Sequence, residues 1–267
     1  MATFDTWESY FYPPPDDATM RNVQNIRDPR VLQAFEYGAT ALRQKQLVAD
    51  PSLVGEHTYG ADHVRAIHRH LFQDVYEWAG EYRTQNMMKQ GAVRGFADVR
   101  TGEVDRYLAD VQRLVNTTEW GRLERDEFAS AAANVFAHLN QAHPFREGNG
   151  RSSKVFMEHV AMRSKFELDF ARVDPNWWNK ASEFSRPDLD KYEPVPDSLV
   201  PVFQHIAEER EGGPAVTGGA GARQRSPLSA SYPMSPTQAA GRHASTRPQE
   251  PHRPGQGYGS SGQGIGR

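Results

Sequence analysis

Apolar residues recur at helical spacing through most of the chain, and this periodicity constrains the fold more than any other feature. Asp28-Pro29 and Asp174-Pro175 each precede such a stripe, as an N-cap followed by a proline in the first helical turn does. Gly80 is expected to end the second helix, and Asp197 to cap the last one. The stripes are Val31–Leu42, Val64–Trp78, Val104–Leu114, Phe128–Leu139, Val155–Val160, Trp177–Phe184 and Leu199–Ile206. The sequence therefore predicts an all-α bundle.

Two segments depart from this pattern. Residues 82–96 are too interrupted for a helix, and Gly91 and Gly95 suit a short β-hairpin. Residues 212–267 are rich in Gly, Pro, Ser, Gln and Arg and have almost no aliphatic side chains. Such a segment cannot bury enough apolar surface to offset its ordering entropy, so we expect a disordered tail: an inert extension, a linker, a partner-binding segment or a secretion signal.

The aromatic N-terminus could either dock a partner or pack on the bundle. An exposed aromatic cluster favours aggregation, so packing is the prediction for its side chains: Phe4, Trp7, Tyr10, Phe11 and Tyr12. The chain then divides into an N-terminal extension (1–24) packed on the core, a main helical domain (25–211) and the tail (212–267).

Charge and composition limit the location and the partners. Residues 212–267 contain six arginines and one glutamate, a net charge of +5, which leaves -8 on residues 1–211. An acidic body is a poor binder of nucleic acid, and none is expected as a partner. There is no cysteine, which excludes disulfides and thiolate sites. No secretory signal or membrane span is visible, so we expect a cytoplasmic protein with no membrane partner, although export as an effector stays possible.

One loop concentrates reactive groups between two helical segments. His143-Pro-Phe-Arg-Glu-Gly-Asn-Gly-Arg151 holds an imidazole, a carboxylate, a Gly-Asn-Gly turn and a cation, and Lys154 follows three residues later. The glycines precede a helix, whose first N–H groups are unpaired and whose dipole end is positive, so the turn can bind an anion. Arg151 can fork two phosphate oxygens, and Lys154 at i+3 is expected to share its face.

The remaining groups of the loop suit catalysis beside a nucleotide. Glu147 offers the carboxylate oxygen that a phosphate-bridging Mg²⁺ takes. His143 is placed to accept a proton from an attacking hydroxyl. Phe145 is expected to point inward as an apolar anchor, and a structural or surface role is favoured for the other nine histidines.

These residues resemble the active-site motif of the Fic (Fic/Doc, Fido-fold) family, His-x-Phe-x-Asp/Glu-Gly-Asn-Gly-Arg-x-x-Arg. Seven fixed positions match without a gap, and the stretch from His68 to Gly80, with Arg83-Thr84 after it, resembles the region leading into the family's flap. The resemblance covers roughly residues 25–211. It implies an all-α Fic-type fold with a β-hairpin flap, and transfer of AMP from ATP to a Tyr, Thr or Ser hydroxyl of a target protein.

The resemblance also assigns the site. It makes His143 the general base, Glu147 the Mg²⁺ ligand, and the rest of the motif nucleotide-binding: Phe145, Arg146, Gly148, Asn149, Gly150, Arg151 and Lys154. The flap is expected to align the target by strand addition, through Asn86, Met87, Met88, Lys89, Gly95 and Phe96.

Lys154 departs from the family pattern, where the second arginine contacts the terminal phosphate and engages an inhibitory glutamate. A lysine keeps the charge and loses the two-pronged grip. A transferase for another nucleotide or for phosphate, and a non-catalytic nucleotide-binding module, therefore stay as alternatives. Neither Ser52–His57 nor Ala207–Gly212 fits the family's inhibitory Ser/Thr-x-x-x-Glu-Gly/Asn helix. Any inhibition is then expected from a small antitoxin protein, as in Fic toxins.

Overall fold

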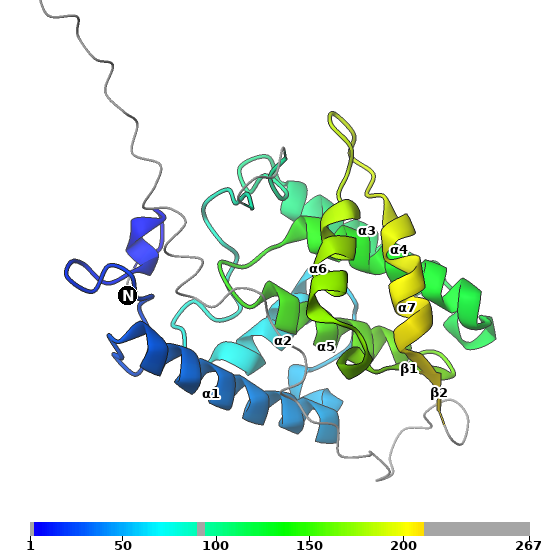
Figure 1. Ribbon diagram of the computed structural model, residues 1–267, viewed down its shortest axis with the longest axis horizontal. Coiled ribbons are helices and arrows are strands. Elements are labelled where there is room, and N and C mark those ends of the chain that lie inside the picture. Colours follow the sequence, from blue (N-terminus) through cyan, green and yellow to red (C-terminus); the bar gives the residue numbers. More distant parts are fainter. Residues whose placement is uncertain (1–2, 90–93, 211–267) are drawn as a thin grey trace, which may run out of the picture.

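The computed structural model describes residues 3–89 and 94–210, and within them seven α-helices surround one core (Figure 1). The helices are α1 (Pro29–Ala49), α2 (Ala61–Phe72), α3 (Glu103–Thr117), α4 (Arg125–Ala142), α5 (Asn149–Ala161), α6 (Pro175–Phe184) and α7 (Val200–Ile206). One short 3-10 turn, Glu8–Tyr10, precedes them, and others lie in the connections between helices: Pro51–Val54, Trp120–Arg122, Phe170–Arg172 and Pro196–Ser198. The predicted all-α bundle is confirmed.

Both Asp-Pro start signals are confirmed in atomic detail. The Asp28 carboxylate accepts hydrogen bonds from Arg30 N and Val31 N, at 2.8 and 3.0 Å, and thereby pairs two otherwise orphaned donors of α1. Asp174 caps α6 in the same way through Asn176 N and Trp177 N. The last helix begins later than predicted, at Val200, because residues 196–198 form a 3-10 turn before it.

The second helix is shorter than its apolar stripe predicts. α2 ends at Phe72, and Val75 and Trp78 are buried from the turns that follow it. The carbonyl of Val75 accepts a hydrogen bond from Val23 N at 2.9 Å instead of one from a further helical turn. Gly80 is therefore not the helix cap, although it does adopt a positive φ of 82°. Periodicity identified the buried side chains correctly and the helix end wrongly.

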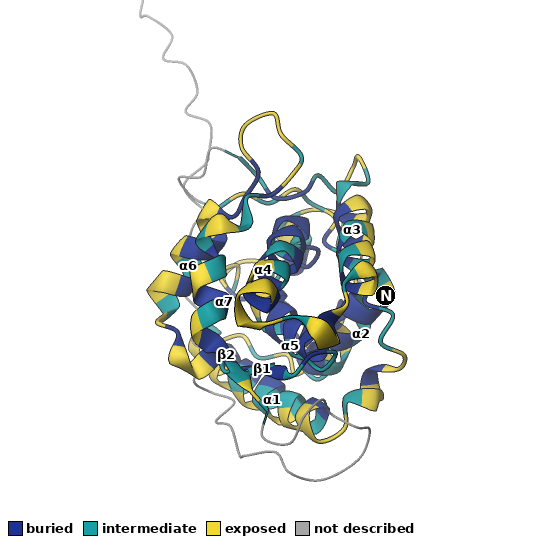
Figure 2. Cartoon of the chain, turned by 90° about the vertical axis from the view of Figure 1, so that its right-hand side faces the viewer, coloured by how far each residue is buried: buried dark blue, intermediate teal, exposed yellow. Residues whose placement is uncertain are grey.

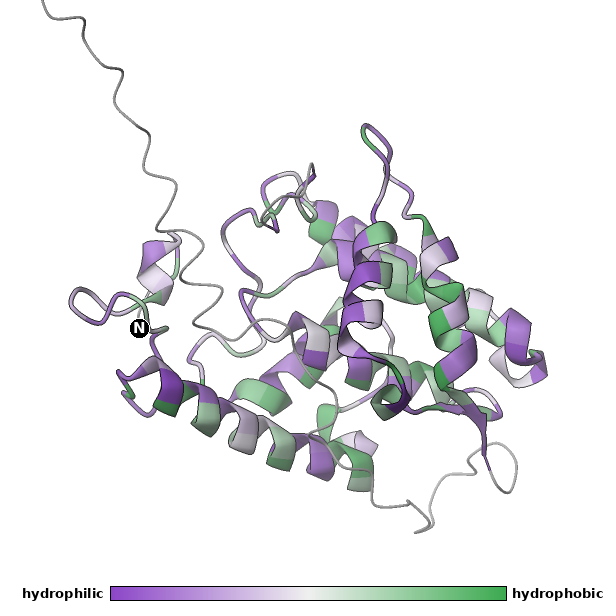
Figure 3. Cartoon of the chain, in the orientation of Figure 1, coloured by the Kyte–Doolittle hydropathy of each residue, from purple (hydrophilic) through white to green (hydrophobic). Residues whose placement is uncertain are grey.

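The core gathers around α4. This helix packs against α3, α5 and α7, and α5 packs in turn against α2. In Figure 2 the buried residues line the inward sides of these helices, while α1, α3 and α6 carry exposed residues on their outer sides. Figure 3 shows the matching division of hydrophobic and hydrophilic residues along each helix. In the described ranges, no helix combines the length and the apolar character that crossing a membrane requires.

A small sheet occurs where none was predicted. β1 (Phe166–Leu168) pairs antiparallel with β2 (Ala207–Glu209), with Phe166 opposite Glu209 and Leu168 opposite Ala207. The expected flap hairpin closes with a backbone hydrogen bond of 2.9 Å from Phe96 N to Met87 O. No strand is assigned in its described parts, residues 86–89 and 94–96, and its tip (90–93) lies outside the described residues, as does the predicted disordered tail (212–267).

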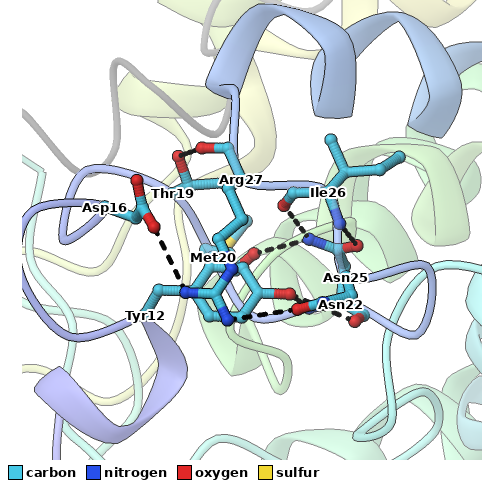
Figure 4. A network of polar contacts seen from close by, with 8 residues as sticks. All are labelled: Tyr12, Asp16, Thr19, Met20, Asn22, Asn25, Ile26 and Arg27. Carbon is cyan, nitrogen blue, oxygen red and sulfur yellow. Dashed lines mark hydrogen bonds and ion pairs between the residues drawn. The ribbon is translucent and has the colours of Figure 1, made fainter.

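The N-terminal segment packs against the bundle. Tyr10 and Met20 are fully buried, and the Tyr10 ring meets Trp78 edge-on at 5.7 Å. The segment then turns into α1 through a polar network around Asn22, whose side chain donates to the carbonyls of Met20 and Ile26 and accepts from Ile26 N (Figure 4). Because these bonds satisfy backbone groups that lack helical partners, the turn before α1 has a defined conformation.

Candidate active site

The motif loop joins the end of α4 to the start of α5, and a left-handed residue stands at each of its ends. His143 is the C-cap of α4 with φ 40°, and Gly148 is the N-cap of α5 with φ 82°. For an L-residue other than glycine this conformation is unfavourable, so the surroundings must hold His143 in place. Arg83 does so, because its Nε donates to the His143 carbonyl at 2.8 Å and its backbone N–H donates to the Pro144 carbonyl at 2.8 Å.

Asn149 fixes the inside of the loop. Its Oδ1 accepts from Phe145 N at 2.9 Å, and its Nδ2 donates to Phe145 O at 2.7 Å. Both polar atoms of the Asn149 side chain are therefore engaged within the loop. Only the backbone of Asn149 is left for the predicted contact with a phosphate. The first hydrogen bond of α5 runs from Ser152 N to Gly148 O at 3.0 Å. The backbone N–H groups of residues 149–151 come before this first helical hydrogen bond, a position from which they can bind an anion.

His68 of α2 contacts the motif loop and helps to hold it in place, a role that the sequence did not predict. Its Nδ1 accepts from Gly80 N at 2.8 Å, so the proton is on Nε2, which donates to the Glu147 carbonyl at 3.0 Å. Burial lowers the pKa of His68 to about 3, which keeps the ring neutral in this tautomer. The ring stacks on Phe145 at 3.8 Å, and Phe145 is 1% exposed, which confirms it as the apolar anchor. That position leaves the Phe145 ring no surface for a nucleotide.

His143 is half-buried and lies in a positively charged environment. Its ring stacks on Phe96 at 3.6 Å with an angle of 10° between the planes. Burial, assisted by the charges of Lys89, Arg83 and Arg186, lowers the pKa of His143 well below 6.5. The imidazole is therefore neutral near pH 7 and able to accept a proton. The same cations make the surroundings attractive to a triphosphate.

Glu147 places a carboxylate at the other end of the loop. Burial and the neighbouring charge of Glu36 raise its pKa, whereas the Arg151 guanidinium, 3.7 Å away, lowers it. A carboxylate that is crowded by a second one gains from a nearby cation. Its oxygen donors also match the preference of Mg²⁺ for one or two carboxylates plus phosphate oxygens. The donor chemistry at Glu147 thus fits that ion.

Arg151 is held by a residue that sequence reasoning missed. Glu36 of α1 is fully buried, and its carboxylate accepts from both the Arg151 guanidinium and the Tyr76 hydroxyl. Thr40 Oγ1 accepts a further bond from Arg151 at 3.1 Å. The only available signal was a single glutamate, at position 36, on the apolar side of a helix that otherwise reads as amphipathic. This ion pair fixes α1 against the start of α5.

Lys154 does not share the face of Arg151, contrary to the sequence-based prediction. It is 5% exposed, and its ammonium lies 5.2 Å from the ring centroids of both Phe170 and Trp178. Side chains at i and i+3 diverge by about 60° around a helix with 3.6 residues per turn. The Arg151 side chain extends to α1, whereas the Lys154 side chain extends to the two aromatic rings. The two cations are therefore not placed to bind one phosphate together.

The buried Lys154 leads to a prediction about stability. Burial lowers the pKa of Lys154 from 10.5 to about 8. The destabilisation from this charge is fully present below pH 8 and disappears as the pH rises from 8 to 10.5, because the unfolded chain binds the proton more tightly there. We expect Lys154→Met to raise the free energy of unfolding by about 1–3 kcal/mol at pH 7. Urea unfolding should show a smaller gain at pH 10, and no gain for the exposed Lys180→Met at either pH.

Arg146 is covered by the N-terminal segment. It is 1% exposed, and its guanidinium lies 3.7 Å from the ring centroid of Trp7 and 5.2 Å from that of Phe11. Burial lowers its pKa to about 10. A side chain enclosed by these rings offers no surface to a ligand, so nothing in this structure supports the predicted nucleotide contact of Arg146, which stays a prediction. Arg146 attaches the N-terminal segment to the motif loop.

Two of the described flap residues, Lys89 and Phe96, lie close to His143. Asn86 Oδ1 accepts from Val99 N at 3.0 Å, a bond that joins the start of the flap to the loop that follows it. Gly95 O accepts from Gln141 Nε2 of α4 at 3.2 Å, a bond that fixes the end of the flap to the bundle. Phe96 stacks on the His143 ring, whereas Met88 is exposed. Met87 contributes the carbonyl that closes the loop. Lys89 contributes charge toward His143.

Known proteins share the part of the chain that contains this site. The sequence profile of the Fic/DOC family matches residues 58–161, which run from before α2 to the end of α5 and include the whole motif loop. The chain is 35% identical over 162 residues to the probable protein adenylyltransferase y4lH of Sinorhizobium fredii, an alignment that covers 60% of this chain and 80% of that protein. The chain belongs to the Fic/DOC family.

This Fic chain is also similar to two Bartonella proteins. It is 31% identical over 172 residues to the protein adenylyltransferase VbhT of Bartonella schoenbuchensis, covering 64% of this chain and 34% of that one, so the chain spans about a third of that relative's length. Its fold is similar to the ADP-bound N-terminal Fic domain of a cell filamentation protein from Bartonella quintana. That similarity has a TM-score of 0.66 at 29% identity and covers 76% of this chain and 95% of the other.

Proposed function

We propose that this Fic chain is a protein adenylyltransferase, which transfers AMP from ATP to a Tyr, Thr or Ser hydroxyl of a target protein. The observation that carries the proposal is the neutral, half-buried His143, held by Arg83 in the loop before α5, whose start has no side-chain cap. A base and an anion site are thereby adjacent. The names of the relatives from Sinorhizobium and Bartonella support the same reaction.

Each residue of the site has a separate role in this reaction. The N–H groups at the start of α5 bind phosphate oxygens, and Glu147 would hold Mg²⁺, which when bound neutralises phosphate charge. His143 accepts the proton of the target hydroxyl through its neutral imidazole. The hydroxyl oxygen forms a bond to the α-phosphorus, the bond from that phosphorus to the bridging oxygen breaks, and pyrophosphate leaves. Arg151 acts through α5, whose start it fixes to Glu36.

The proposal extends to partners and organisation. The target would align along the flap, where Met88 is exposed and Lys89 lies beside the base. Residues 25–211 would form the catalytic domain, with residues 1–24 as its extension and 212–267 as a tail. Because ATP and Mg²⁺ are cytoplasmic, the reaction would occur there. The acidic body argues against binding of nucleic acid.

A separate antitoxin protein is proposed as the inhibitor. Of the two glutamates that a built-in inhibitory helix could use, Glu56 is exposed in the loop before α2, and Glu211 lies outside the described residues. An inhibitor from another chain would supply the missing glutamate, and the chain would then resemble the toxin of a toxin–antitoxin pair.

Labelled ATP tests the function directly. The protein is incubated with Mg²⁺ and ATP carrying the label at either the α- or the γ-phosphate, with candidate targets or for self-labelling. Transfer of the α-label alone supports an adenylyltransferase. Transfer of the γ-label would mean phosphate transfer, and the absence of both would favour a non-catalytic nucleotide-binding module. Parallel reactions with GTP, CTP and UTP test the nucleotide that Lys154 favours.

The lowered pKa of His143 predicts the pH dependence of the reaction. Since the neutral imidazole is the active form, kcat/KM should stay level from pH 8 down to 6.5 and fall only at lower pH. Lys89→Ala removes one of the charges that lower this pKa, so the acid limb should move to higher pH. Lys180→Ala, on the outer side of α6, should leave the profile unchanged. A limb centred above pH 6.5 in the unmodified protein would contradict a base whose pKa is lowered by its surroundings.

A further inference from the structure

Three histidines meet at a place that the proposed reaction does not use. His57 lies in the loop before α2, His63 in the first turn of α2 and His159 in the last turn of α5. His63 is 1% exposed and His159 2%, whereas His57 is half-buried. Ten residues of α5 separate His159 from the motif loop, which is about 15 Å of helix. The cluster therefore stands apart from the catalytic residues.

The ring nitrogens converge. His63 Nε2 and His159 Nδ1 are 3.0 Å apart, and one potential ligand atom from each of the three residues can be chosen so that all lie within 4.8 Å of one another. The His57 ring lies parallel to both, with centroids 4.6 Å from His63 and 4.3 Å from His159. His57 Nε2 donates to the Pro51 carbonyl at 3.1 Å, which leaves the lone pair of that ring on Nδ1.

The cluster is incomplete as a set of hydrogen bonds. One proton between His63 and His159 satisfies two nitrogens, yet within the described residues Nδ1 of His63 is buried and has no hydrogen-bond partner. Burial lowers the pKa of His63 to about 3 and that of His159 to about 2, so both rings are neutral at pH 7. Neutral imidazoles with available lone pairs are the form in which histidine binds metal ions.

We propose that His57, His63 and His159 form a binding site for a divalent transition-metal ion, with Zn²⁺ as the reference ion. Imidazole nitrogen is a preferred donor for Zn²⁺, and two histidines bound tetrahedrally at 2.0–2.1 Å have their nitrogens about 3.3 Å apart. The His63–His159 pair needs to open by only a few tenths of an ångström, and the proton between the two nitrogens moves to the other nitrogen of the ring that carries it. The half-buried His57 turns its ring to direct its in-plane lone pair at the ion, and water fills the fourth position.

The site would act on the fold. Its ligands come from α2, from α5 and from the loop before α2, so a bound ion would link the two helices that hold the motif loop and His68. A ligand that binds only the folded state raises stability by mass action. This inference is independent of the proposed reaction, because its readouts are binding and thermal unfolding.

The experiment uses the untagged full chain, stripped with a chelator and titrated with ZnCl₂. We expect one Zn²⁺ bound per chain, and a rise in Tm of about 5 °C or more when free Zn²⁺ exceeds Kd a hundredfold. With Co²⁺ as the probe, the visible spectrum should show tetrahedral coordination. His159→Gln should lose binding and the rise in Tm.

Two further variants keep the test decisive. His57→Ala changes a half-buried ring, so it should fold and still lose most of the affinity. His205→Gln, on α7 and away from the cluster, should bind like the unmodified protein. Absence of stoichiometric binding in the unmodified chain would overturn the site and leave the cluster as three packed histidines. So would binding by His57→Ala and His159→Gln that equals binding by the unmodified chain.

Discussion

Replacing His143 should abolish AMP transfer while leaving the bundle folded. A positioned general base contributes about 10²- to 10⁴-fold to a rate, and His143 is the imidazole of the motif loop, held between Phe96 and the carbonyl contact of Arg83. Without it, the target hydroxyl must lose its proton to water. We therefore expect the rate of α-label transfer to fall by at least a hundredfold, measured as initial rates at saturating ATP.

The choice of substitution matters because His143 adopts φ 40°. Alanine is unfavourable in this left-handed conformation, so His143→Ala could also disturb the turn. Asparagine tolerates the conformation and has no basic nitrogen, which makes His143→Asn the matched variant. We expect both variants to lose transfer and His143→Asn to keep the Tm and the nucleotide affinity of the unmodified protein. Transfer by His143→Asn at more than a tenth of the normal rate would exclude His143 as the base.

Local sequence signals predicted the fold well where a helix end is determined by its own residues. The Asp-Pro caps of α1 and α6 are of this kind, and so is the glycine turn before α5. The end of α2 depends on Val23, which lies far away in the sequence and takes the Val75 carbonyl. The pairing of β1 with β2 joins residues about forty positions apart. Periodicity carries no information about such distant partners.

In the candidate site, too, the features determined by neighbouring residues were predictable and those determined by distant residues were not. The motif placed the base, the carboxylate and the helix start at one loop, because their chemistry and spacing are local. The orientations of the cationic side chains depend instead on residues of other elements. Arg151 pairs with Glu36 of α1, aromatic rings enclose Lys154, and Trp7 covers Arg146. A buried glutamate or histidine on an apolar stripe, such as Glu36 or His68, is the sequence signal most worth following for such partners.

Gly148→Ala should damage both stability and activity, because two separate constraints act on this glycine. Its φ of 82° is unfavourable for alanine, and an added Cβ would lie 2.4 Å from two ring carbons of Phe72 and 3.1 Å from Nε2 of His68. Backbone strain and overpacking each cost about 1–3 kcal/mol. We expect urea unfolding to show a loss of about 2–5 kcal/mol. A shift of the loop by even 1 Å should also slow transfer by about a hundredfold.

Gly102→Ala provides the control that separates the two constraints. Gly102 is the N-cap of α3 with φ 76°, and a Cβ there would meet nothing within 4 Å. This variant should show the backbone strain alone, about 1–2 kcal/mol, with normal transfer. Phe72→Leu in the Gly148→Ala background should restore part of the lost activity, since it removes the ring that the methyl group meets. If the two glycine variants lost equal stability and Phe72→Leu restored nothing, close packing of Gly148 on α2 would not be what positions the loop.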